Sequence, residues 1–234
     1  MTSYCYEVET LIIGIAFGGI ISLAQFYSEY ICSICSRRAT GITSFSAGVA
    51  VSYLFLGLFP EFVSEVQNTE RWLYVFTLLG FVLLHLIEKY IYQHSAPRAV
   101  TTRLERENSI VSFAYHIIIG IIIVNLTTRG TLEGLLFVIP IALYTALGTL
   151  PEHVAPQRSL HVALSLAPLF GVMFAWLLGR WITTAVSAAL IGFIVGALAF
   201  TVIRHAIPFG KEGRPLWFTA GLALYVPLVL LLPS

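Results

Sequence analysis

WLYVFTLLGFVLLHLIEKY, residues 72–90, is the stretch that decides the fold class. It begins at Trp72 and holds no acidic or basic side chain except His85 before it reaches Glu88. A helix needs about 20 mainly apolar residues to cross the hydrocarbon core of a bilayer, so this stretch predicts a membrane-spanning helix. Similar stretches predict eight spans, near 9–27, 42–62, 72–93, 110–126, 133–153, 160–178, 182–204 and 215–232. We therefore expect an all-α integral membrane protein in which residues 1–234 form a single transmembrane domain.

The composition of the chain agrees with this class. The chain is 58% hydrophobic and 11% charged, and its mean hydropathy is +0.87. A soluble domain is roughly 25% charged, so much of this apolar surface must face lipid. The net charge of +1 gives no sign of a nucleic-acid partner. All twelve acidic residues are glutamates, which excludes mechanisms built on an aspartate dyad or a Ser-His-Asp triad.

The positive charges predict how the chain is oriented. With eight spans, both termini lie on one side, and the thirteen lysines and arginines then divide three against ten. The positive-inside rule places the side with ten in the cytoplasm, so both termini of this multi-pass protein are predicted to be extracytoplasmic. The three on the side of the termini are Arg71, Arg129 and Arg180.

Two of the predicted spans share a pattern of glycine and proline. Gly48 and Pro60 in the second span are twelve residues apart, as are Gly196 and Pro208 in the seventh. The predicted topology runs these two spans in opposite directions. An inverted repeat of this kind is typical of secondary transporters, whose substrate site lies near the middle of the membrane.

Polar residues within the apolar stretches are the candidates for function. Glu152 and His153 follow Pro151 at the end of the fifth span, and His116 lies inside the fourth. Ionisable groups at membrane depth are costly and therefore mark functional sites. By the rise of 1.5 Å per residue, His116 and Glu152 both lie within roughly 6–10 Å of the cytoplasmic side. Together they predict a thin site for a divalent ion of the zinc type. The alternative for His116 is a hydrogen bond to a neighbouring helix or a role as proton carrier.

Other ionisable groups are secondary candidates along a transport path, each with a structural alternative. Glu61 follows Pro60 and also fits an interfacial glutamate. His85 and Glu88 are three apart on one helix face, where they would also satisfy each other. His205 and His161 lie near span ends, where an interfacial position is expected.

These motifs resemble the ZIP family of divalent-metal transporters over almost the whole chain. The resemblance lies in residues 46–49 and 58–61 of the second span, 78–81 and 86–89 of the third, 148–152 of the fifth, and 196–197 and 205–208 of the seventh. It implies a 3+2+3 bundle of eight helices with an inverted repeat and both termini outside. It also implies zinc as the transported substrate, no organic cofactor, and His116 and Glu152 as metal ligands. The expected partners are the lipid bilayer and a divalent metal ion, and a homodimer stays open.

The chain also departs from the family at several ligand positions. The family's fifth-span histidine falls on Gly148, its second-span histidine on Gly57, and a seventh-span glutamate on His205. Each loss removes a ligand, and the lost glutamate also removes charge that would offset the dehydration of a divalent cation. The resemblance therefore predicts a weak one-metal site rather than a strong two-metal site.

Two alternatives to metal transport remain. In the first, the chain keeps the ZIP fold but serves a regulatory, interaction or other-solute role. In the second, it is an intramembrane hydrolase in which Ser112 shares a helix face with His116, four residues later. The chain contains neither Gly-x-Ser-x-Gly nor His-Glu-x-x-His, so we expect no enzyme.

Overall fold

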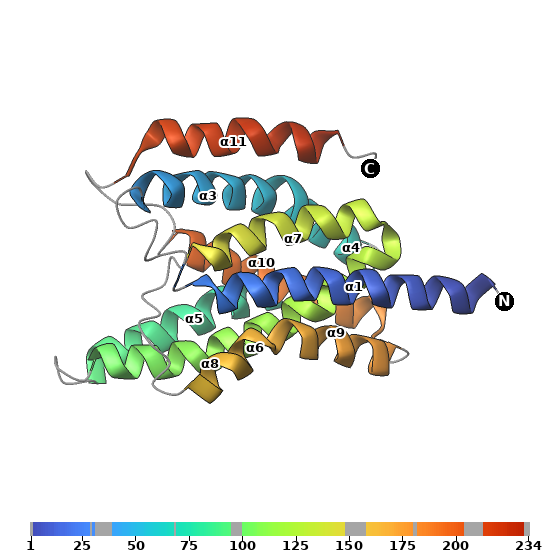
Figure 1. The fold of residues 1–234 in the computed structure, drawn as a ribbon, viewed down its shortest axis with the longest axis horizontal. Coiled ribbons are helices and arrows are strands. Elements are labelled where there is room, and N and C mark those ends of the chain that lie inside the picture. The colour runs from blue at the N-terminus through green and yellow to red at the C-terminus, as the bar shows by residue number, and fades with distance from the viewer. Residues whose placement is uncertain are drawn as a thin grey trace.

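The computed structural model describes residues 2–28, 30, 39–67, 69–94, 100–147, 158–179, 182–203 and 213–231. Within these residues the chain is helical and has no β-strand (Figure 1). A π-helical turn (Leu54–Leu58) joins α3 to α4, and a 3₁₀ turn (Arg71–Leu73) precedes α5. The helices are α1 (Thr2–Phe26), α3 (Ala39–Tyr53), α4 (Phe59–Gln67), α5 (Tyr74–His94), α6 (Val100–Arg129), α7 (Thr131–Ala146), α8 (Arg158–Ser165), α9 (Ala167–Leu178), α10 (Thr184–Thr201) and α11 (Pro215–Leu230).

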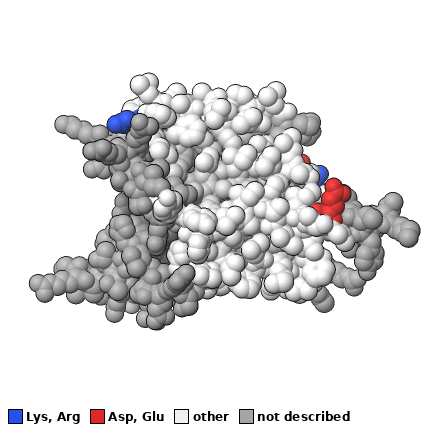
Figure 2. Space-filling view, in the orientation of Figure 1, with Lys and Arg blue, Asp and Glu red and all other residues white. Residues whose placement is uncertain are grey.

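Five segments are long and apolar enough to cross a membrane: Val8–Phe26, Thr40–Gln67, Arg71–Tyr90, Ser112–Arg129 and Thr184–Thr201. Three shorter apolar helices, α7, α9 and α11, lie alongside them. On the face that Figure 2 shows, the visible charged side chains lie toward the two ends of the long axis, with an uncharged surface between them. This distribution is expected for a multi-pass membrane protein, because the lipid-facing belt must be apolar. The start of α1 and the end of α11 lie at the same end of the bundle (Figure 1).

Three pairs of helices approach each other closely at glycines: α3 with α11, α5 with α10, and α6 with α9. In all six cases a Cβ on the glycine would collide with the carbonyl oxygen three residues before the facing glycine. Backbone therefore lies directly against backbone, which is the packing that small residues allow between membrane helices. The facing glycines are Gly48 with Gly221, Gly80 with Gly196, and Gly120 with Gly171.

The helices divide into two groups by their contacts. We call α1, α6, α7 and α9 the first bundle, and α3, α4, α5, α10 and α11 the second bundle. In the first bundle, α1 and α6 each contact the other three helices, whereas the second bundle consists of two close pairs, α3 with α11 and α5 with α10, joined through α4 and the π turn. Contacts between the bundles are fewer and run mainly from α7 to α3 and from α6 to α10 and α5.

The helices depart from the predicted spans at two interruptions. The sixth stretch is broken between α8 and α9, two residues before Pro168, whose ring lacks the N–H that a continuous helix would use. The second stretch contains the π turn, in which the N–H of Phe59 donates to the carbonyl of Leu54. This turn begins six residues before Pro60, and residues 202 and 203 take the same conformation beginning six residues before Pro208. The predicted end of the fifth span, residues 148–153, lies outside the described residues.

Candidate functional site

His116, one of the two predicted metal ligands, is a buried polar residue. It lies on α6, one helical turn before Gly120, and its side chain is 6% exposed. Its Nδ1 lies 2.7 Å from the carbonyl oxygen of Ser112 on the same helix. Its Nε2 is buried and has no hydrogen-bond partner in the described part of the chain. The partner of His116 is therefore its own helix rather than the neighbouring helix that the structural alternative predicted.

The contact with the Ser112 carbonyl fixes which nitrogen of His116 carries the proton. A carbonyl oxygen only accepts, so a neutral imidazole must donate its proton from Nδ1. Nε2 then keeps a free lone pair, which is the arrangement of histidines that bind metals through one nitrogen and are oriented through the other. The Ser112 hydroxyl lies 3.3 Å from Nδ1, as the shared face predicted, but a protonated Nδ1 cannot take its proton. This tautomer counts against Ser112 as an activated nucleophile.

Three residues predicted to contribute lie outside the described residues: Glu152, His153 and His205. Whether Glu152 meets His116 therefore stays a prediction. Among the residues that the structure does describe, no group of three or more His, Cys, Asp or Glu side chains could hold a metal ion. Of the two residues predicted to hold the metal, the structure describes only His116, whose Nε2 is the candidate ligand atom.

A second cluster of polar side chains lies where α4, α6 and α10 meet, at the end of the molecule that carries the termini (Figure 1). Arg129, the last residue of α6, forms ion pairs with both Glu61 and Glu65 of α4. The Glu65 side chain is 5% exposed, and its Oε1 accepts a hydrogen bond of 3.2 Å from the Ser187 hydroxyl of α10. Arg129 also donates to Asn125 on its own helix at 3.1 Å. We call Glu61, Glu65, Arg129 and Ser187 the outer cluster.

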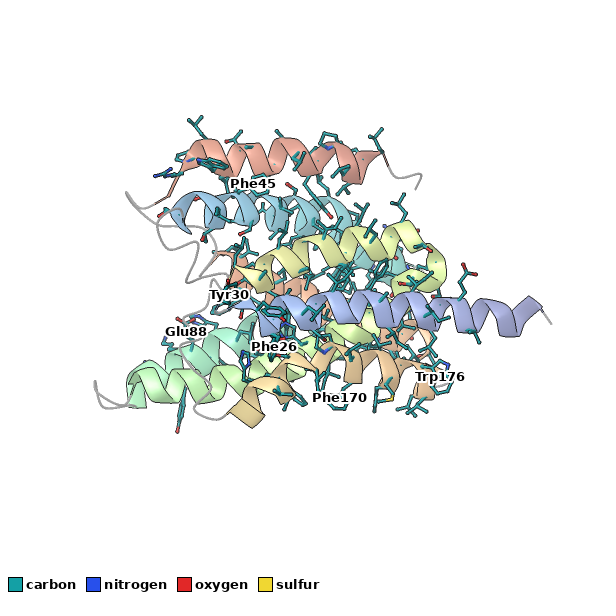
Figure 3. The ribbon with its side chains drawn as sticks, viewed as in Figure 1. Phe26, Tyr30, Phe45, Glu88, Phe170 and Trp176 are labelled. Carbon is teal, nitrogen blue, oxygen red and sulfur yellow. The ribbon has the colours of Figure 1, made fainter. Side chains whose placement is uncertain are left out.

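The remaining predicted residues lie near the opposite end of the bundle. His85 is exposed on α5, and its ring centroid lies 6.0 Å from that of Phe200 on α10. Glu88 lies at the end away from the termini (Figure 3), where the sequence predicts the cytoplasmic side. His161 is half-buried on α8, with its ring 5.5 Å from that of Phe26 at the end of α1. Its position near a helix end is the one expected of an interfacial histidine.

Sequence reasoning recognised only one member of the outer cluster. Glu61 is a secondary candidate along the transport path, with an interfacial position as its alternative, and its side chain is 30% exposed. From the sequence, Arg129 served only as one of the positive charges that predict the orientation in the membrane, and neither Glu65 nor Ser187 was a candidate. One signal was available: Glu61 and Glu65 are four residues apart, so two carboxylates share a helix face and require a cation nearby.

No protein-family model matches the chain, and no curated protein matches it. The resemblance to the ZIP family therefore stays a prediction that rests on the residues themselves.

Proposed function

We propose that this protein is a ZIP-like membrane transporter that moves a divalent metal cation, zinc above all, across the membrane by alternating access. The observation that carries the proposal is the pattern of helix contacts. If the chain has eight spans, α8 and α9 together form the sixth. An inverted repeat would relate the first span to the sixth, the second to the seventh, the third to the eighth and the fourth to the fifth. Under this exchange, each main pair of contacting helices is converted into another pair that is also in contact. The pair α3–α11 becomes α10–α5, and the pair α6–α9 becomes α7–α1, and all four pairs are in contact. This supports eight spans in a 3+2+3 arrangement with an inverted repeat.

The close glycine contacts support the same exchange. Gly48 of the second span and Gly196 of the seventh are 148 positions apart and are the matched glycines of the sequence repeat. Gly48 faces Gly221 of the eighth span, and Gly196 faces Gly80 of the third, with the same register in both contacts. The π turns at Leu54–Leu58 and at residues 202–203 repeat with the same offset of 148. A chance match of one glycine and one proline would not reproduce a helix contact and a backbone irregularity as well.

The two bundles supply a mechanism for alternating access. When the spans of the proposed repeat are exchanged, the helices of each bundle replace other helices of the same bundle. Each bundle would therefore have an internal pseudo-two-fold symmetry. Inverted-repeat transporters work by rocking one such body against the other around a central site. The contacts between the bundles are fewer than those within them, so relative movement breaks little packing. The site would then face one side of the membrane at a time.

His116 on the first bundle is the residue proposed to hold the metal. Its lone pair at Nε2 is buried and its other nitrogen is held by the Ser112 carbonyl, as a metal-binding imidazole requires. Imidazole suits Zn²⁺, and the carboxylate of Glu152 would supply the second ligand and a negative charge. His153, Glu61, His205, Glu88 and His85 are proposed as secondary polar points along the path.

Calorimetric zinc titration of the purified protein tests the site. We expect saturable binding near one equivalent for the unaltered chain and none for His116→Ala/Glu152→Ala. His161→Ala is the matched control, because it removes a histidine near a helix end and should leave binding unchanged. The absence of saturable binding to the folded, unaltered chain would refute the metal site.

One alternative function has an observation in its favour. The described residues contain no group of three His, Cys, Asp or Glu side chains that could hold a metal ion. The carboxylates of Glu61 and Glu65 already form ion pairs with Arg129. A ZIP-fold protein that serves a regulatory, interaction or other-solute role would show this depletion. The alternative predicts that the His116→Ala/Glu152→Ala variant keeps the protein's cellular function, so complementation of a deletion strain by this variant separates the two proposals.

A further inference from the structure

The outer cluster contains the oxygen ligands of a cation site, and the side chain of Arg129 lies between them. Glu61 and Glu65 share one face of α4, and Arg129 reaches both from the end of α6. We propose that the two carboxylates and the Ser187 hydroxyl form a second binding site, for a hard divalent cation of the Mn²⁺ type, which the Arg129 guanidinium occupies in this conformation. The site is distinct from His116 and does not depend on a metal being bound there.

The burial of Glu65 is the first observation behind this site. Its side chain is 5% exposed, while that of Glu61 is 30% exposed. Oε1 of Glu65 accepts from Ser187 and pairs with Arg129, but Oε2 is buried and has no hydrogen-bond partner in the described part of the structure. A buried carboxylate oxygen without a donor is unfavourable, because the group has lost its water. One carboxylate oxygen of the cluster is therefore left without an electropositive partner in this conformation.

The charge balance is the second observation. The guanidinium carries one positive charge and pairs with the carboxylates of Glu61 and Glu65, and Glu133 also interacts with it electrostatically, so negative charge is left uncompensated. A divalent cation in the same place would neutralise both carboxylates. The donors are all oxygens, two carboxylates and a hydroxyl, and oxygen donors favour Mg²⁺, Ca²⁺ and Mn²⁺ over softer metals. Charge and ligand type thus favour a hard divalent cation.

The members of the cluster come from both bundles, which gives the site a link to conformation. Arg129 belongs to the first bundle, whereas Glu61, Glu65 and Ser187 belong to the second. A movement that separates the bundles at this end would withdraw the guanidinium and uncover the carboxylates. This link to conformation rests on the proposed alternating access, whereas the binding site rests on the cluster alone.

Titration of Mn²⁺ followed by electron paramagnetic resonance tests the site, because free and protein-bound Mn²⁺ give different signals. The experiment uses the full chain in detergent with His116→Ala, so that the first site cannot contribute. Adding Arg129→Gln removes the competing charge and should raise the Mn²⁺ affinity at least about tenfold, with one equivalent bound. Adding Glu65→Gln on top should abolish this gain. Glu70→Gln is the matched control, since Glu70 is an exposed carboxylate that instead accepts a hydrogen bond from Trp72.

A folded Arg129→Gln variant that binds Mn²⁺ no better than its parent would overturn the proposal, as would a gain that survives Glu65→Gln. If Arg129→Gln does not yield folded protein, Arg129→Lys replaces it, because an ammonium group cannot bridge two carboxylates as a guanidinium does. Millimolar Mn²⁺ should then raise the melting temperature of Arg129→Lys but not of Arg129→Lys/Glu65→Gln. Equal melting temperatures with and without Mn²⁺ in both variants would also overturn the site. A failure of zinc binding at His116 leaves this test unaffected.

Discussion

The glycine contact between α5 and α10 gives the sharpest prediction about the fold. In Gly196→Ala, the new Cβ would collide with the carbonyl oxygen of Thr77 and lie 2.9 Å from the amide nitrogen of Phe81. Both atoms belong to the backbone and cannot rotate away, so the two helices must move apart. We therefore expect Gly196→Ala to destabilise the protein, although alanine is the better helix former.

The magnitude follows from two opposing terms. Overpacking costs about 1–3 kcal/mol, and a collision between backbones belongs at the upper end of that range. Replacing glycine by alanine inside a helix returns about 1 kcal/mol. The net loss is about 2 kcal/mol, which lowers the melting temperature of a chain of this length by about 4–8 °C. A loss of similar size is expected for Gly48→Ala, whose new Cβ would collide with the carbonyl oxygen of Phe218.

Gly19 on α1 provides the matched control, because a Cβ there meets no atom within 4 Å. Gly19→Ala should leave the melting temperature unchanged or raise it slightly, since only the helix-propensity term applies. Thermal unfolding in detergent, followed by circular dichroism, compares the three variants with the parent. Equal melting temperatures for Gly196→Ala and Gly19→Ala would refute the close contact between α5 and α10.

Three further variants are checked by the same unfolding assay. Phe62→Ala removes a ring that is 0% exposed and should cost about 3–5 kcal/mol, so a loss below about 1 kcal/mol would contradict its place in the core. Tyr225→Phe removes a hydroxyl that donates to the Leu136 carbonyl at 2.5 Å and should cost about 1 kcal/mol; no change would argue against that bond. Arg129→Gln should cost about 1–3 kcal/mol, less than for a fully buried pair because the Arg129 side chain is 33% exposed. Adding Glu65→Gln should recover part of that loss, and additive losses would show that the pair is not coupled.

The apolar stretches were sufficient to predict the helices, because the length and hydropathy of each stretch reflect the thickness of a bilayer. The structure confirms an all-helical chain with five helices able to span a membrane, in its described residues. The count of eight stays a prediction. The two glycines that the sequence pattern matches, Gly48 and Gly196, each make a close contact with a facing glycine, while the inverted repeat itself stays a prediction.

Helix pairing could not be predicted from composition. Side chains that face lipid and side chains that face another helix are equally apolar, so hydropathy does not distinguish Leu78, which is 62% exposed, from Ile191, which is 0% exposed. The π turn before Pro60 was missed for a related reason, since the proline predicts an interruption but not its geometry.

The candidate site was predictable only where residues act within one helix. The spacing of Ser112 and His116 was enough to place the two side chains together on α6. The outer cluster depends on three helices meeting, so the role of Arg129 could not be predicted from the local sequence.

Metal transport is tested most directly by zinc flux into liposomes that contain the purified protein and a zinc-sensitive dye. We expect a saturable uptake that exceeds that of protein-free liposomes and is lost in His116→Ala/Glu152→Ala. An uptake by folded, reconstituted protein no greater than that of protein-free liposomes would contradict metal transport.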